Sequence, residues 1–171
     1  MPRAMQLYLV RHAHAVTPEE NPIRPLSEVG RAATARLGAF LRTTGTFAPT
    51  QLWHSPLERS RETTRGLVAA LGAEIMEVET DDLLPEDDPA LIAGRLAAYP
   101  VTHDLGLVGH EPHLSALATL LVRGKTTPTA FVMRKGAVLA LERTDRLHRK
   151  TGLPRWRVRW HLSPELLKAF V

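Results

Sequence analysis

Short, wholly apolar runs alternate along most of the chain with longer segments in which apolar and polar residues mix at helical spacing. Apolar runs too short for a helix are typical of strands buried on both faces. The predicted strands are residues 7–10, 51–54, 74–78, 105–108, 137–141 and 155–160. The predicted helices are residues 27–42, 56–71, 89–98 and 112–122, with a short one beginning at 163–164. This alternation predicts a three-layer α/β/α sandwich around a mainly parallel sheet, as one domain spanning residues 1–171.

The first helix has recognisable capping residues and an apolar stripe. Ser27 can accept a hydrogen bond from the first turn, and Gly45 is suited to end the helix. Gly72 has the same role in the second helix, and Pro56 suits its first turn. The stripe expected to face the core of the first helix is Val29, Ala33, Leu37, Phe40 and Leu41.

A basic stretch, Arg143 to Arg159, supports two interpretations. Its second half alternates arginine with large apolar residues, in the order Arg155, Trp156, Arg157, Val158, Arg159 and Trp160. The period of two predicts a β-hairpin with one solvated and one buried face. Arginines beside aromatic residues are also typical of nucleic-acid surfaces, on which bases stack. We favour the hairpin and expect no nucleic-acid partner.

Composition limits the classes of protein to consider. With 44% hydrophobic and 23% charged residues, the chain is typical of a folded soluble protein. It has no apolar run of membrane-spanning length, no secretory signal pattern and no cysteine, so we expect a cytoplasmic protein without disulfides. The net charge of +4 suits an anionic substrate.

Polar residues follow three of the predicted strands: Arg11-His12, His54-Ser55 and Gly109-His110. The carboxyl ends of parallel strands lie along one edge of a sheet, so these residues should meet in one crevice. Arg59 lies about one turn into the helix after Ser55 and can point back into that crevice.

Two guanidiniums and two imidazoles suit a phosphate dianion. Guanidinium forks match phosphate oxygens, and nearby cations disfavour protonation of His12. A neutral imidazole is a competent nucleophile toward phosphorus. We expect neither a metal nor a cofactor, because the two arginines would repel a cation.

Three motifs in this order resemble the histidine phosphatase superfamily, whose fold is phosphoglycerate-mutase-like. They are residues 9–13 (LVRHA), residues 55–59 (SPLER) with Thr63, and residues 108–112 (VGHEP). The short chain, and residues 23–27 (IRPLS) followed by Gly30, look most like the SixA-type phosphohistidine phosphatases. The similarity spans roughly the first three-quarters of the chain.

The resemblance implies a role for each matching position. His12 would be the nucleophile that becomes phosphorylated, with Arg11 and Arg59 binding the phosphoryl oxygens. His110 would be the second catalytic histidine, which stabilises the transferring group.

Further positions are assigned to the surroundings of the phosphate. Arg24 would line the phosphate pocket or hold the neighbouring loop. Ser55 is placed with it beside the substrate and, together with Thr63, would fix the turn and the helix that carry Arg59. The remaining histidines near these motifs are expected to be bystanders, namely His14, His54 and His113.

Many members of the superfamily carry a carboxylate general acid in an inserted segment, for which this chain has no room. The candidate here is Glu86 in the acidic loop 81–88, with Asp87, Asp88 and Glu111 as weaker choices. An alcohol leaving group needs protonation far more than an imidazole with a pKa of about 6.5. The missing acid therefore favours phosphohistidine as the substrate.

The sequence thus predicts a hydrolase, a metal-independent phosphohistidine phosphatase acting on a phosphorylated protein through a covalent intermediate on His12. A phosphatase of small phosphate esters that uses the same site, with a carboxylate from loop 81–88, remains open. A mutase is less favoured because the chain is short. From a different class, a non-enzymatic phosphate or nucleic-acid binding module also remains open. Neither the phosphorylated partner nor the oligomeric state follows from the sequence.

Overall fold

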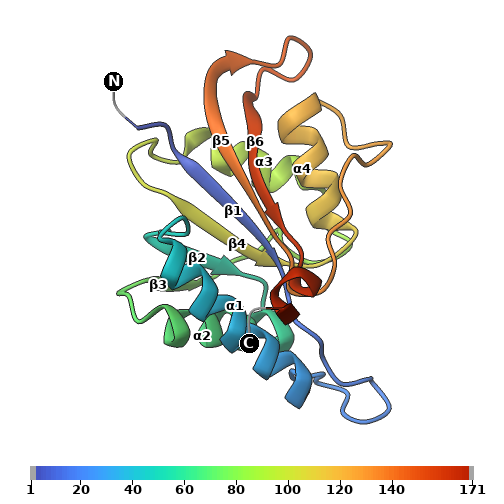
Figure 1. Cartoon of the computed structure of the whole chain (residues 1–171). Helices are drawn as coiled ribbons and strands as arrows, with labels where there is room; N and C mark the ends of the chain where they lie inside the picture. The colour runs from blue at the N-terminus through green and yellow to red at the C-terminus, as the bar shows by residue number, and fades with distance from the viewer. Residues whose placement is uncertain (1–2, 170–171) are drawn as a thin grey trace.

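The computed structural model describes residues 3–169, in which helices cover both faces of a six-stranded sheet (Figure 1). The strand order is β3-β2-β4-β1-β5-β6. The strands are β1 (Gln6–Arg11), β2 (Gln51–His54), β3 (Met76–Glu79), β4 (Leu105–Gly109), β5 (Val138–Leu147) and β6 (Pro154–Leu162).

Four strands of the sheet run parallel and two antiparallel. β1, β2, β3 and β4 are parallel to one another, whereas β5 pairs antiparallel with β1 and β6 antiparallel with β5. β1 is an inner strand whose side chains enter both cores: Leu7 and Leu9 face one, Tyr8 and Val10 the other. The predicted mainly parallel sheet is confirmed.

The helices form the two outer layers. They are α1 (Glu28–Thr44), α2 (Glu58–Leu71), α3 (Pro89–Ala98), α4 (His113–Arg123) and a 3-10 helix, η1 (Pro164–Ala169). α1, α2 and η1 enclose one core, and α3 and α4 enclose the other (Figure 1). This arrangement confirms the predicted three-layer sandwich. Within residues 3–169, no helix is both long and apolar enough to cross a membrane.

α1 begins and ends as predicted but is rotated relative to the predicted stripe. The Gly30 N–H donates to Ser27 Oγ over 3.1 Å, and Gly45 ends the helix with φ of +63°. Val29 was expected inside, yet 72% of it is exposed. Gly30 faces inward instead, because the chain passes so close that a Cβ there would lie 2.0 Å from His14 O. Close backbone approach of this kind requires glycine.

β3 lies later in the chain than predicted. It spans Met76–Glu79 rather than 74–78 because it pairs in register with β2, Gln51 opposite Met76 and His54 opposite Glu79. As an edge strand it is mostly exposed, so its sequence carries little apolar signal.

The predicted hairpin is present, but the large apolar residues of its second strand do not share one buried face as predicted. The pairing shifts between β5 residues Ala140 and Leu141, which face Trp160 and Val158, so β6 carries one extra residue there. Such a bulge reverses the alternation of faces. Trp156 consequently lies in the core beside α3 and α4, Trp160 packs against the opposite core, and Val158 is 43% exposed.

Candidate active site

The polar ends of β1, β2 and β4 meet at one edge of the sheet. β4 lies between β1 and β2, with Arg11 opposite Gly109 and His54 opposite Val108. The His12 N–H donates to Gly109 O over 3.0 Å, and the His12 and His110 ring centroids are 5.0 Å apart. The three strand ends therefore bring Arg11, His12, Ser55 and His110 together as the strand order predicts, and this cluster with Arg59 is called the crevice.

His12 is held with one ring nitrogen available for reaction. Only 5% of it is exposed, and its Nδ1 lies 2.7 Å from Ala13 O. A carbonyl oxygen only accepts, so Nδ1 carries the hydrogen and Nε2 keeps its lone pair. Burial, helped by the charges of Arg59 and Arg11, lowers the pKa of His12 to about 4 despite the Ala13 hydrogen bond. The imidazole is thus neutral near pH 7.

His110 is buried beside two hydroxyl groups. Its Nε2 lies 2.6 Å from Ser55 Oγ and 3.2 Å from Ser60 Oγ. Its Nδ1 is buried and has no hydrogen-bond partner among residues 3–169. Burial, followed by the effects of His12 and Arg59, lowers the pKa of His110 to about 3. This imidazole is also neutral near pH 7.

The two guanidiniums of the crevice have no carboxylate partner in the described chain. Arg11 Nη1 donates to Met133 O over 2.8 Å, while the Nε atoms of Arg11 and Arg59 are buried without a partner. Burial lowers the pKa of both guanidiniums. Buried cations with free donors are costly unless an anion binds them, which makes the crevice suited to a phosphate group.

Thr63 joins β1 to the helix that carries Arg59. Its hydroxyl accepts from the Ala13 N–H over 3.0 Å and donates to Arg59 O over 2.7 Å. It thus fixes the position of α2 relative to the chain just after His12.

Arg24 lies close enough for its charge to lower the pKa of Arg59. Its backbone is left-handed, with φ of 56°, and its Nε donates to Val16 O over 3.2 Å. One edge of its guanidinium therefore holds the loop between β1 and α1.

The carboxylates near the crevice are occupied or exposed. Glu111 accepts hydrogen bonds from the backbone N–H and the hydroxyl of Ser115, so it caps α4. Asp87 accepts from the Leu84 N–H. Glu86 is exposed and makes no hydrogen bond or ion pair within residues 3–169, although its charge partly offsets the lowering of the Arg59 pKa by burial and by Arg24.

The three histidines expected to be bystanders lie at the border of the crevice. His14 is exposed and its Nδ1 lies 2.8 Å from Ser27 Oγ. His54 Nδ1 lies 2.9 Å from Ser55 O. His113 is buried at the start of α4, and neither of its ring nitrogens has a partner in the described chain.

Two residues at the crevice were absent from the predicted site. Lys135 is exposed, but its charge contributes to the lowered pKa of His12. Ser60 contacts His110, and a sequence signal for it exists. The buried stripe of α2 has hydroxyl residues where apolar ones are expected, and it comprises Ser60, Thr63, Thr64, Leu67 and Leu71.

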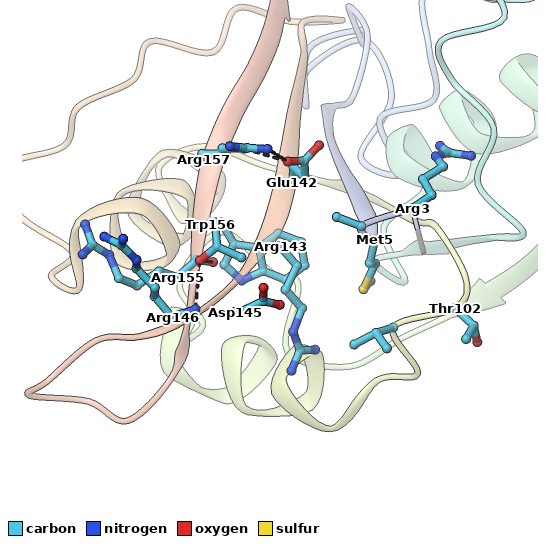
Figure 2. Close-up of a pocket in the computed structure, with 13 residues that line it drawn as sticks. Arg3, Met5, Thr102, Glu142, Arg143, Asp145, Arg146, Arg155, Trp156 and Arg157 are labelled. Atoms are coloured by element: carbon cyan, nitrogen blue, oxygen red, sulfur yellow. Dashed lines mark hydrogen bonds and ion pairs between the residues drawn. The ribbon is translucent and has the colours of Figure 1, made fainter. Parts of the chain in front are cut away.

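A hollow lies at the end of the sheet where β1 begins, away from the crevice, and Figure 2 shows the residues that line it. This basic groove has a volume of about 710 Å³ and is lined by arginines from the N-terminal segment, β5 and β6. Arg143 and Arg157 lie beside the buried Trp156, and Arg3 lies across the groove from it (Figure 2).

Three of the five arginines that line the basic groove are bound to other groups of the chain. Arg3 pairs with Asp104 at 2.5 Å, and Arg157 Nε donates to Glu142 over 2.6 Å. Arg143 donates to the carbonyls of Leu96 and Ala97 at the end of α3, each over 3.1 Å. Trp156 is only 3% exposed, so its ring offers no face on which a base could stack. This geometry weakens the nucleic-acid interpretation of the basic stretch.

Comparison with known proteins agrees with this geometry. A protein histidine phosphatase SixA bound to tungstate has a TM-score of 0.78 at 20% identity, covering 95% of this chain and 99% of that one. A protein from Agrobacterium tumefaciens, provisionally named phosphohistidine phosphatase SixA, has a TM-score of 0.71 at 24% identity, with 94% and 98% covered. A mycobacterial glucosyl-3-phosphoglycerate phosphatase has a TM-score of 0.67 at 17% identity, with 91% and 97% covered.

At these identities the likeness establishes the phosphoglycerate-mutase-like fold. No curated protein matches the sequence significantly. The sequence model of the histidine phosphatase superfamily (branch 1), however, matches residues 7–98, more than half of the 171 residues. The chain belongs to the histidine phosphatase superfamily.

Proposed function

We propose that this protein is a phosphatase that hydrolyses phosphohistidine through a covalent intermediate on His12. The observation that carries the proposal is the state of His12: a neutral, buried imidazole whose Nδ1–H is bound to Ala13 O, leaving the Nε2 lone pair free. Membership in the histidine phosphatase superfamily supports the same reaction class.

In the first step, the lone pair of His12 Nε2 attacks the phosphorus of the substrate. The new N–P bond forms as the P–N bond to the substrate imidazole breaks, and that imidazole, which carries a proton on its other ring nitrogen, leaves as a neutral imidazole with the electron pair. Arg11 and Arg59, whose Nε–H groups are free, bind the oxygens of the transferring group.

In the second step, water attacks the phosphorus bound to His12. The bond to Nε2 breaks, inorganic phosphate leaves, and the lone pair returns to Nε2. The imidazole of His110, 5.0 Å from His12 between ring centroids, is placed beside the transferring group in both steps.

The preference for phosphohistidine rests on the absence, among residues 3–169, of a carboxylate bound to the site residues that could act as a general acid. Within residues 3–169, none is bound to Arg11, Arg59, His12 or His110, and Glu111 is occupied with Ser115. An alkoxide leaving group would need a positioned acid, whereas an imidazole leaves readily without one.

A matched comparison of substrates tests this preference. Purified protein is given a phosphohistidine protein and a panel of alkyl and aryl phosphates, with His12→Ala as the control. We expect kcat/KM to be highest for the phosphohistidine protein and turnover to be lost in His12→Ala. Faster hydrolysis of alkyl phosphates than of the phosphohistidine protein would refute the preference while keeping the phosphatase.

The second candidate is a phosphatase of small phosphate esters with Glu86 as general acid. One observation favours it, since the charge of Glu86 acts on Arg59. Under this alternative, Glu86→Gln loses most alkyl-phosphate turnover but hydrolyses aryl phosphates, whose leaving groups are better, nearly as well as the wild type. Under the main proposal, Glu86→Gln leaves phosphohistidine turnover within about twofold.

A further inference from the structure

Two buried hydroxyl groups lie within hydrogen-bonding distance of one ring nitrogen of His110. Ser55, in the loop after β2, places Oγ 2.6 Å from Nε2, and Ser60, in the first turn of α2, places Oγ 3.2 Å away. Both serines are fully buried. Neither hydroxyl has another acceptor within residues 3–169, because the only other contact of Ser55 Oγ is with an N–H donor, that of Leu57.

Counting donors and acceptors separates the two tautomers of a neutral His110. If Nε2 carried the hydrogen, both serine hydrogens would be buried without an acceptor, and Nδ1 would be a buried acceptor without a donor. If Nδ1 carries the hydrogen, that N–H also lacks an acceptor in the described chain, but the Nε2 lone pair accepts from Ser55 and is shared with Ser60, so fewer buried groups are unmatched. Each unmatched buried polar group destabilises the protein, so the second tautomer is favoured.

We propose that Ser60 is a positioning residue which, together with Ser55, holds His110 as the Nδ1–H tautomer. The inference rests on the proposed function for its catalytic meaning, but not for its geometry. Ser60 lies next to Arg59 in the chain, so the same turn of α2 places a phosphate-binding guanidinium and orients the second histidine.

The two histidines of the crevice are then held in opposite tautomers. His12 presents the lone pair of Nε2, because its Nδ1–H is bound to Ala13 O. His110 presents a hydrogen on Nδ1, the buried ring nitrogen that has no partner in the described chain. That N–H can donate to an oxygen of the transferring phosphoryl group, where charge develops in the transition state.

Side-chain ¹⁵N NMR of the substrate-free protein measures the tautomer directly. The His110 signals are assigned by their loss in His110→Gln. We expect a pyrrole-type Nδ1 and a pyridine-type Nε2 in the wild type. Between Ser55→Ala and the Ser55→Ala/Ser60→Ala double variant, the ratio of Nδ1–H to Nε2–H tautomer should fall about fivefold, the effect of one neutral hydrogen bond.

Kinetics provide the second readout. Adding Ser60→Ala to Ser55→Ala should lower kcat by up to about fivefold with KM within twofold, since the substrate is bound but the Nδ1–H donor is less populated. The control is Thr64→Val, which removes a buried hydroxyl one turn further along α2 that bonds to Ser60 O and not to His110. It should keep kcat within twofold.

The inference is overturned if the wild type has the hydrogen on His110 Nε2. It is also overturned if the Ser60 substitution changes the tautomer ratio by less than twofold, or if Thr64→Val lowers kcat as much as Ser60→Ala. Because NMR needs no turnover, a protein inactive on every phosphorylated substrate would refute the proposed function and leave this test of Ser60 intact.

Discussion

The crevice and the basic groove both gather arginines at an end of the same sheet, yet they differ in what those arginines do. In the groove, Arg3 and Arg157 are paired with carboxylates, and Arg143 binds the last carbonyls of α3. In the crevice, Arg11 and Arg59 bury Nε–H groups that no residue of the described chain accepts.

The difference shows that a large hollow is not by itself evidence of a catalytic site. The groove has a volume of about 710 Å³, but Arg3, Arg143 and Arg157 in it already bind other groups of the chain. The crevice holds charges that the protein itself leaves without counterions, and such groups persist at sites where a ligand completes them.

Replacing the nucleophile should have the greatest effect. His12→Asn should lower kcat about 10⁴-fold, because no other group of the crevice can form the covalent intermediate. The matched control is His14→Asn, two residues away, whose exposed ring is hydrogen-bonded to Ser27 Oγ. It should retain activity within twofold. Equal losses in the two variants would show that the segment, and not the His12 imidazole, carries activity.

The contrast between the two sets of arginines predicts unequal losses. Arg59→Met should lower kcat/KM about 10²- to 10³-fold, because a preorganised donor to the transition state is removed. Arg157→Met, in the basic groove, should leave kcat/KM within twofold. If Arg157→Met were as damaging as Arg59→Met, the groove would have to take part in catalysis or substrate binding.

Acid should destabilise the crevice. The folded-state pKa values of His12 and His110 lie near 4 and 3, below the usual 6.5, so only the unfolded chain binds these protons as pH falls from 6.5 to 4. The free energy of unfolding should therefore fall by about 2 kcal/mol for each histidine between pH 7 and pH 5. Urea denaturation of the wild type and of the His12→Asn/His110→Gln variant measures it. The variant should lose less stability on acidification, and an equal loss would contradict these pKa shifts.

The smallest effect is expected from a structural arginine of the groove. Arg143→Met removes two hydrogen bonds to the end of α3 and should lower the free energy of unfolding by about 1 kcal/mol. Thermal unfolding together with phosphatase assays separates stability from activity. Activity should be unchanged under conditions in which the variant is folded, whereas a specific loss of kcat would place Arg143 in the function.

The sequence predicts which residues meet in the crevice because each of them directly follows a short apolar strand. The apolar run before Arg11 can only be a buried strand, and parallel strands bring their carboxyl ends to one edge. That rule places His12, Ser55 and His110 together without knowledge of any distance. The capping role of Ser27 likewise depends on local sequence.

Features that depend on tertiary register escaped prediction. The bulge in β6 places Trp160 against the opposite core from Trp156, although the sequence alternates without interruption. Val29 is exposed because the close approach of Gly30 to His14 sets the rotation of α1. Ser60 is recognised only when the partner of its hydroxyl, His110 Nε2, is known.

The most direct test of the central claim is to trap the intermediate. Protein mixed with a ³²P-labelled phosphohistidine substrate is quenched at high pH within milliseconds, digested and sequenced by mass spectrometry. We predict an acid-labile, alkali-stable phosphate on the peptide that contains His12, and none in His12→Asn. Label on any other residue, or hydrolysis at the full wild-type rate in His12→Asn, would contradict the assignment of His12 as the nucleophile.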